Sequence, residues 1–231
     1  TPLLCLYHSL YICTQVAYMS DSKPKSRQAP PKMPLKLASQ TLKPKTDITK
    51  LVTSADIKQR QSELSALRYL SGYRAEVVEQ IKQLVDTQAL GAHFLSRYPR
   101  VHDIRTDKAL YDMTIKLKNT FMRQSDPLAK VIFDDKINVS HHALGLHSYV
   151  NRRQGSKVKA KNEIRISSRL KQIPFELLQM VVVHELAHLR EKDHNKAFYQ
   201  LCTFMLPDYH QLEFDMRVWL VAEAAGQSPY A

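Results

Sequence analysis

The sequence predicts an α+β protein in which helices come first, a small antiparallel sheet follows, and further helices complete the chain. Apolar residues recur at spacings of three and four before residue 125 and again after Pro174, as they do in helices with one buried face. Between these regions, residues 131–167 contain short apolar runs and a polar–apolar alternation, which is typical of strands. Only five of the 231 residues are glycine, which favours helices and argues against a glycine-rich phosphate loop.

Composition divides the chain into three regions. Residues 1–50 are rich in proline and lysine and lack apolar periodicity, so we predict a disordered basic tail. Residues 1–18 are interpreted as an extension that is not native, because Met19 opens a polar stretch that resembles a natural start. Residues 51–125 form a predicted helical region, and residues 126–231 contain the motif that indicates a chemical function.

Charge and cysteine content narrow the class of protein. The formal net charge is +12, which suits an anionic substrate or partner, although part of the excess lies in the tail. The three cysteines are sparse and show no Cys-x-x-Cys spacing, which argues against a disulfide scaffold and predicts a reducing, cytoplasmic location. No segment approaches the roughly 20 apolar residues of a membrane span, so we expect no membrane association.

Three helices are predicted before the strands. The first covers about 54–70 and is interrupted by Gly72. The second covers about 77–85 and is expected to end at Gly91. The third begins at Thr106, a favourable N-cap residue, and places four apolar side chains on one face: Leu110, Met113, Leu117 and Phe121.

The strands and the later helices follow in order. Residues 131–133 and 137–139 are predicted to form short strands, and 146–150 is predicted to pair antiparallel with 158–167 around a turn at Gly155. After the strands, Pro174 is suited to the start of a helix. We expect that helix to run through Leu189, a second to cover about 195–206, and a last one to cover about 212–220.

The helix after Pro174 carries the sequence His184-Glu185-Leu186-Ala187-His188. Residues four apart in a helix lie on one face, so the imidazoles of His184 and His188 can reach one ion. Glu185 follows the first histidine and is placed to accept a proton from a metal-bound water. The surrounding residues are apolar, and buried polar groups are costly without strong partners. The motif therefore predicts a Zn²⁺ site with Glu185 as the general base.

A third ligand is needed, because catalytic zinc sites commonly use three protein ligands and one water. His194 is the first candidate, and it can approach the ion only if the helix ends after about Arg190. In that case Asp193 is expected to cap the next helix, which places His194 in the first turn of that helix. The alternative ligands are two acidic residues further along the chain, Glu213 first and Glu223 second.

These residues resemble a known family. The segment Val182–Leu189, followed by His194, Phe198 and Pro207-Asp208-Tyr209, is similar to the YgjP-like and SprT-like zincin metallopeptidases. The resemblance covers roughly residues 130–220 and implies a minimal zincin fold, with a short sheet packed on the helix of His184 and His188, and His194 as the third ligand; we predict that this zincin-like core spans residues 126–231. The segment Leu144–Ser148 shares only its glycine with the Trp-Gly-Ser-Cys element usual in YgjP-like proteins.

The resemblance implies a zinc-dependent metallopeptidase that hydrolyses peptide bonds of a protein or peptide substrate. Either Tyr209 or His210 is a candidate donor to the oxyanion that forms in such a reaction. If residues 163–167 are a free sheet edge, they could hold an extended peptide by strand addition.

Two alternative functions depend on the basic residues of 151–171, where eight lysines and arginines face one acid, Glu163. This hairpin could bind the phosphates of a nucleotide substrate, which predicts a hydrolase of a phosphorylated small molecule. It could also follow a nucleic-acid backbone, in which case the zinc would be structural. A second histidine group, at His141, His142 and His147, is a further but weaker candidate for a metal site.

Overall fold

The structure is a computed structural model that describes residues 62, 65–137, 145–154 and 157–230. In chain order, its elements are η1 (Leu67–Leu70), α3 (Ala75–Asp86), α4 (Leu90–Arg97), α5 (Asp107–Phe121), β1 (Leu128–Asp134), β2 (Gly145–Gln154), β3 (Lys157–Ser167), η2 (Ser168–Gln172), α6 (Phe175–Ala187), α7 (Lys196–Met205) and α8 (Tyr209–Ala224). The predicted α+β class is confirmed. No helix in this described part of the chain is long and apolar enough to cross a membrane.

The sheet is mixed, and the prediction of an antiparallel sheet is wrong in one of its two pairings. The strand order is β1-β3-β2. β2 pairs antiparallel with β3, as predicted, whereas β1 pairs parallel with β3. The chain enters β2 at the far edge of the sheet, and the hairpin then returns β3 between the other two strands. Because β3 is central, residues 163–167 are not a free edge.

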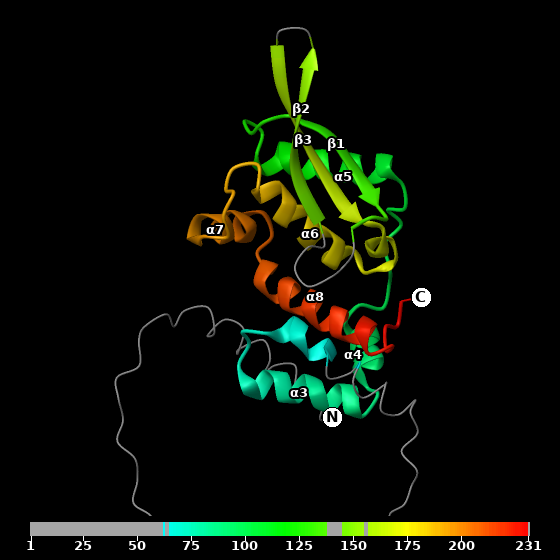
Figure 1. Ribbon diagram of the computed structural model, residues 1–231. Coiled ribbons are helices and arrows are strands. Elements are labelled where there is room, and N and C mark those ends of the chain that lie inside the picture. Colours follow the sequence, from blue (N-terminus) through cyan, green and yellow to red (C-terminus); the bar gives the residue numbers. More distant parts are fainter. Residues whose placement is uncertain (1–61, 63–64, 138–144, 155–156, 231) are drawn as a thin grey trace, which may run out of the picture.

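The two faces of the sheet differ. Ile164 and Ile166 of β3 are fully buried, and α5 and α6 cover the sheet on the side of the body of the molecule (Figure 1). On β3, Arg165 alternates with these isoleucines and pairs instead with Asp134 at 2.9 Å and Glu163 at 3.4 Å. The alternation seen in the sequence therefore reflects one apolar face and one face of paired charges.

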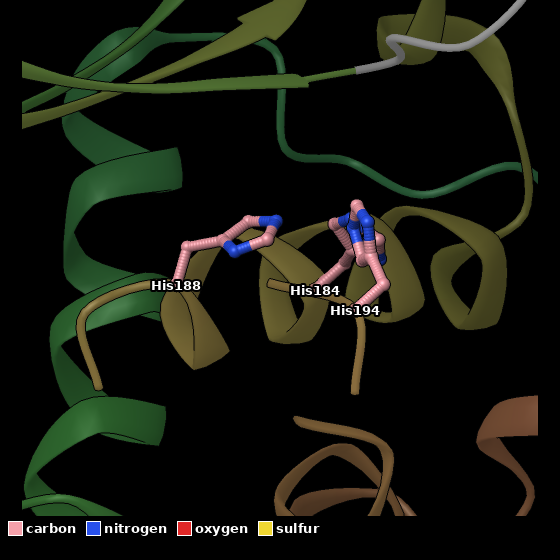
Figure 2. Close-up of side chains that lie close together, drawn as sticks. All are labelled: His184, His188 and His194. Atoms are coloured by element: carbon pink, nitrogen blue, oxygen red, sulfur yellow. The ribbon is translucent and has the colours of Figure 1, made fainter. Parts of the chain in front are cut away.

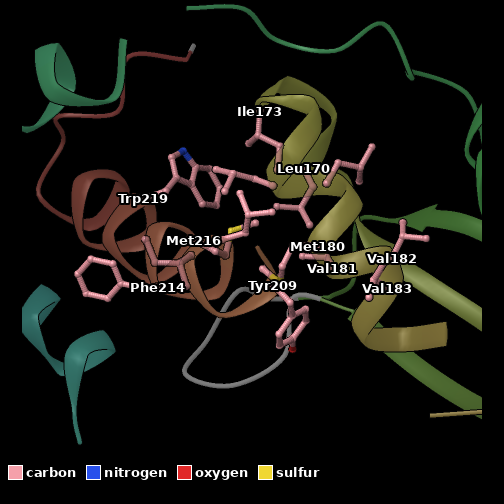
Figure 3. Packing of buried hydrophobic residues seen from close by; sticks show 14 of the residues in the cluster. Leu170, Ile173, Met180, Val181, Val182, Val183, Tyr209, Phe214, Met216 and Trp219 are labelled. Carbon is pink, nitrogen blue, oxygen red and sulfur yellow. The ribbon is translucent and has the colours of Figure 1, made fainter. Parts of the chain in front are cut away.

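The core continues from the sheet through α6 to α8. Figure 3 shows Met180 and Val181 of α6 and Met216 and Trp219 of α8 among the apolar side chains that fill the space between the two helices. α6 contributes buried residues all around its axis, because the sheet and α5 cover one side and α7 and α8 cover the other. The helix that carries the candidate ligands is thus held rigidly on most sides.

Of the helices before the sheet, η1 and α4 pack on the side of α8 away from the sheet, and α3 packs on η1 and α4, whereas α5 lies against the sheet (Figure 1). The third predicted helix is confirmed as α5, with the Thr106 hydroxyl accepting from the backbone N–H of Ala109 at 3.2 Å. The predicted helix end at Gly91 is wrong, because the turn is made earlier by Gln88, whose φ is 56°. Gly91 lies inside α4, where a Cβ would meet the carbonyl oxygen of Gln227 at 2.7 Å.

Several predictions lie outside the described residues. They concern the tail 1–50, the start of the helix near residue 54, and the strand positions 138–139. The same holds for His141 and His142 of the second histidine group.

Candidate metal centre

α6 brings the first two histidines together. It begins after Pro174, as predicted, and ends at Ala187, two residues before Leu189. His188 is the C-cap residue, but its backbone keeps a right-handed helical conformation with φ −64° and ψ −13°. The spacing of four residues therefore still places His184 and His188 on one face, and their ring centroids are 5.0 Å apart.

His194 completes a group of three imidazoles. One ring nitrogen from each of the three histidines lies within 4.8 Å of the others, and Nε2 of His194 is 3.1 Å from Nε2 of His184. Figure 2 shows the three side chains converging beside α6. This arrangement can hold a metal ion, since three imidazoles with one open position form a common zinc site.

The local structure that positions His194 differs from the prediction that Asp193 caps the next helix. Asp193 does not cap α7. Instead, the side chain of Asn195 accepts from the backbone N–H of Phe198 at 2.9 Å. His194 consequently precedes the helix and lies in the loop between α6 and α7, rather than in the first turn of α7. This loop position lets the imidazole turn back toward α6.

Two of the rings form hydrogen bonds through Nδ1, on the side away from the other histidines. Nδ1 of His188 is 3.0 Å from the backbone carbonyl oxygen of Glu191, and Nδ1 of His184 is 2.7 Å from the Tyr209 hydroxyl. A carbonyl can only accept, so Nδ1 of His188 carries the proton. Its Nε2 is then the metal-binding nitrogen, as in most histidine sites with an oriented ligand ring.

The electrostatics of the group also suit a metal ion. Burial is the main cause that lowers the pKa of His184 to about 3, and the neighbouring charges of His188, His194 and Arg217 add to it. Burial also lowers the pKa of His188, against the effect of the Glu191 carbonyl. Both imidazoles are therefore neutral at pH 7, which is the form that binds a metal.

Glu185 lies between α6 and the start of β2. Its side chain is 5% exposed. A Cβ on Gly145 would meet its Oε1 at 2.5 Å and its Cγ at 2.7 Å. The backbone of Gly145 therefore packs directly against the side chain of Glu185, and only glycine allows this contact.

The alternative ligands lie elsewhere. Glu213 pairs with Arg217 at 3.3 Å, and Glu223 pairs with Arg169 at 3.0 Å. Neither carboxylate belongs to the group formed by the three histidines among the described residues. Tyr209 is fully buried, with its hydroxyl on Nδ1 of His184, the nitrogen away from the metal side. This placement argues against Tyr209 as the oxyanion donor.

Three features of the site were missed by sequence reasoning. They are the Asn195 cap, the contact of Tyr209 with His184, and the contact of Gly145 with Glu185. A signal existed for the first, because Asn followed by a helix is a common N-cap. It also existed for the third, since the glycine shared with the family's Trp-Gly-Ser-Cys element is Gly145. The contact of Tyr209 joins residues 25 apart in the chain and had no local signal.

Comparison with known proteins agrees with this geometry. The YgjP-like metallopeptidase domain family matches residues 127–218. A UTP pyrophosphatase of Escherichia coli (strain K12) is 52% identical over 165 residues, which cover 71% of this chain and 99% of that protein. The chain belongs to the YgjP-like family. As a YgjP-like protein it is a metal-dependent hydrolase, and its three histidines are a donor set suited to that class. No solved structure matches the chain significantly.

Proposed function

We propose that this YgjP-like protein is a zinc-dependent hydrolase that splits UTP into UMP and pyrophosphate. The observation that carries the proposal is the 52% identity, over nearly the whole relative, to a UTP pyrophosphatase. Identity at this level, together with three converging imidazoles beside a buried glutamate, supports the same reaction class. The substrate is then a polyanion, which suits a basic protein of net charge +12.

His184, His188 and His194 would hold the ion, each through one ring nitrogen. Three nitrogen donors with a fourth position open to water are the pattern of catalytic zinc. When bound, the ion supplies a Lewis acid and lowers the pKa of its water toward neutrality.

Glu185 is the proposed general base. It accepts a proton from the attacking water, whose oxygen adds to the α-phosphorus of UTP while the bond from that phosphorus to the bridging oxygen breaks. The products are UMP and pyrophosphate, and the proton taken by Glu185 is returned to solvent. Gly145 keeps the Glu185 side chain on the sheet side of α6, so the carboxylate is held in place rather than free to rotate.

Peptide-bond hydrolysis is the second candidate, favoured by the metallopeptidase domain of the family. Strand addition at residues 163–167 does not support it. Residues 163–167 belong to the central strand β3, so they offer no free edge to an extended peptide. The nucleotide reaction therefore stands ahead of the peptidase reaction.

The outer part of the basic hairpin lies away from Glu185 along the sheet. Gly145 lies against Glu185. Arg152 follows Gly145 by seven residues on β2, and its backbone lies opposite that of Lys159 on β3. At about 3.3 Å per residue, the backbone of Arg152 is roughly 23 Å from Gly145. The outer hairpin extends away from α6 in Figure 1, and its contact with the phosphates of a nucleotide stays a prediction. A nucleic-acid contact through residues 151–171 stays a prediction.

The test compares wild type with Glu185→Gln. UTP is incubated with zinc-loaded protein, and UMP and pyrophosphate are quantified, with casein as a parallel substrate. Removal of a general base lowers kcat by about 10²–10⁴-fold, while the zinc content per chain should stay unchanged. Glu176→Gln is the matched control, because Glu176 lies exposed in the first turn of the same helix and should leave the rate unchanged.

Each outcome decides between the candidates. Cleavage of casein without hydrolysis of UTP would move the assignment to the peptidase. Full UTP hydrolysis by Glu185→Gln would remove Glu185 from the mechanism. Bound zinc without turnover of either substrate would favour a structural zinc site.

A further inference from the structure

We propose that the outer end of the hairpin, residues 150–154 and 157–161, is a docking ribbon for double-stranded DNA and binds it through one basic face. We call this segment the ribbon. The proposal goes beyond the hydrolase reaction, because it concerns a partner other than the substrate of the metal centre, and it does not depend on what that substrate is.

The ribbon is the part of the hairpin that extends beyond the third strand. β1 begins its pairing with β3 at Leu128, opposite Asn162. The pairs from Val150 opposite Lys161 outward join only β2 and β3 among the described residues, and Figure 1 shows this end extending beyond the rest of the sheet. At about 3.3 Å per residue, the ribbon is roughly 13 Å long. A two-stranded segment alone is marginally stable in water, so contacts with a partner would stabilise it.

The ribbon is strongly basic. Its ten residues include five lysines and arginines and no aspartate or glutamate. The next acidic residue along β3 is Glu163, which already pairs with Arg165 at 3.4 Å. The ribbon therefore contains no acidic residue that could neutralise its charge.

Strand register places four of the five basic residues on one face. Successive residues of a strand alternate between faces, and residues directly opposite each other in an antiparallel pair share a face. Lys157, Lys159 and Lys161 alternate along β3, and Arg152 lies opposite Lys159. Arg153 follows Arg152 on β2 and therefore belongs to the other face. The ribbon thus has one basic face with four charged positions.

Two of these charges face each other across the strands. Arg152 and Lys159 occupy directly opposite positions. Like charges at such positions destabilise a sheet, whereas opposite charges stabilise it. A bound anion would offset this repulsion. The cross-strand pair therefore favours an anionic partner.

The shape and composition of the ribbon favour duplex DNA among anionic partners. The major groove of B-DNA is about 12 Å wide and admits a two-stranded β-ribbon, whereas the major groove of an RNA duplex is too narrow for side chains to read. Single strands are bound largely by stacking on aromatic side chains, and the ribbon contains no aromatic residue. Its two valines, Val150 and Val158, form too small an apolar surface for insertion into a membrane.

The first experiment measures the affinity of the full chain for a labelled DNA duplex of mixed sequence by fluorescence anisotropy. If each of the four residues neutralises one phosphate, the ribbon contributes about −3.6 to the slope of log K against log salt concentration, which is about 150-fold in affinity between 50 and 200 mM salt. A four-site variant combines these changes: Arg152→Gln, Lys157→Gln, Lys159→Gln and Lys161→Gln. It should bind at least about tenfold more weakly at 50 mM salt, with a slope less negative by about 1 for each residue.

Two controls separate the basic face from charge in general. Arg152→Gln and Arg153→Gln are a matched pair, because the residues are adjacent but belong to opposite faces. The first should make the slope less negative by about 1, and the second should leave it unchanged. A second four-site variant removes the same number of charges from exposed positions on or beside other elements, and it should bind DNA like wild type: Arg100, Lys108, Lys116 and Arg123, each changed to Gln.

The outcomes are distinguishable from failure of the proposed function. UTP hydrolysis is measured on the same samples, and the ribbon variants should keep the rate of wild type. Equal DNA affinity in wild type and the ribbon four-site variant would overturn the proposal, as would equal effects of Arg152→Gln and Arg153→Gln. Loss of UTP hydrolysis with unchanged DNA binding would assign the ribbon to the nucleotide instead.

Other anionic partners are compared with the same full chain. The probes are an RNA duplex, single-stranded DNA, and phosphatidylcholine vesicles that contain phosphatidylserine. The DNA duplex should bind most tightly. Tighter binding of any of these three probes than of the DNA duplex would overturn the assignment of the ribbon to DNA.

Discussion

At the scale of single residues, the position of Glu185 depends on the absence of a Cβ at Gly145. The side chain of Glu185 occupies the space where a Cβ of residue 145 would lie, so the start of β2 can approach α6 only because Gly145 has no side chain. A general base must be held within a few tenths of an ångström of its working position to be effective. Gly145 therefore acts on the proposed chemistry through the glutamate.

Gly145→Ala should lower the rate of UTP hydrolysis by at least about tenfold, since a misplaced catalytic group costs one to two orders of magnitude. The measurement is kcat at saturating UTP, with zinc content determined on the same sample. Gly91→Ala is the control, because its Cβ would meet the Gln227 carbonyl oxygen at a similar 2.7 Å but away from the site. It should lower stability and leave kcat unchanged, and equal loss of kcat in both variants would contradict the argument.

Residues near one another in sequence were the ones that sequence reasoning could place. The spacing of His184 and His188 put both on one helix face, because helix periodicity is local. The position of His194 was harder, since it depends on where α6 ends and on which residue caps α7. The sequence predicted the return of the chain but assigned the cap to Asp193 instead of Asn195.

At the scale of elements, the segment before α5 is tied to the turn that leads into α6. The backbone N–H of His102 donates to the carbonyl oxygen of Ile173 at 3.1 Å. Its Nδ1 accepts from the backbone N–H of Ile104, so its Nε2 carries the proton and donates to the carbonyl oxygen of Leu170 at 2.8 Å. This buried ring is satisfied only when neutral, because a proton on Nδ1 would face another N–H.

Acid should therefore destabilise the fold through His102. Burial lowers its pKa below the ordinary 6.5, so below pH 6.5 the unfolded chain binds a proton that the folded chain does not. The free energy of unfolding then falls as the pH falls, by no more than about 1.4 kcal/mol per pH unit for one proton. Urea denaturation of zinc-free protein at pH 7.5 and 5.5 should show a smaller pH dependence for His102→Gln than for wild type. Equal dependence in the two proteins would contradict this role.

The pairing of the strands shows why topology was only partly predicted. The hairpin of β2 and β3 is local in sequence and was predicted from the two strand patterns around Gly155. The parallel pairing of β1 with β3 joins strands separated by β2, and no local pattern encodes which edge a strand occupies. For the same reason, the sequence did not reveal that residues 163–167 belong to the central strand and not to a free edge.

At the scale of the whole molecule, a buried polar network joins the helices before the sheet to the last helix. The carboxylate of Asp215 on α8 is 5% exposed. It accepts from the Tyr98 hydroxyl at 2.5 Å and the Gln211 amide at 2.8 Å, and it pairs with Arg97 at 3.1 Å. One cluster of buried apolar residues continues across the same boundary. The division between residues 51–125 and 126–231 remains a prediction. It was based on composition, and the buried apolar cluster does not separate the two ranges.

Asp215→Ala should lower the free energy of unfolding by about 3 kcal/mol, at the lower end of the range for a broken buried ion pair because Arg97 is partly exposed. Urea denaturation measures the change. Asp86→Ala is the control, since its pair with Lys82 is exposed on one helix and contributes about 0.5 kcal/mol or less. A loss of similar size in both variants would mean that the network does not join α4 to α8.

The uniform chemistry of the three candidate ligands has a consequence for the choice of ion. All three are imidazole nitrogens. The group contains no thiolate, which would favour soft metals. For such donors the affinity rises from cobalt through nickel to copper, and zinc binds less tightly than copper. A protein passed over a nickel resin would accordingly carry nickel into the assay. The ion that supports turnover should therefore be identified by stripping the protein and restoring each metal in turn at equal free concentration.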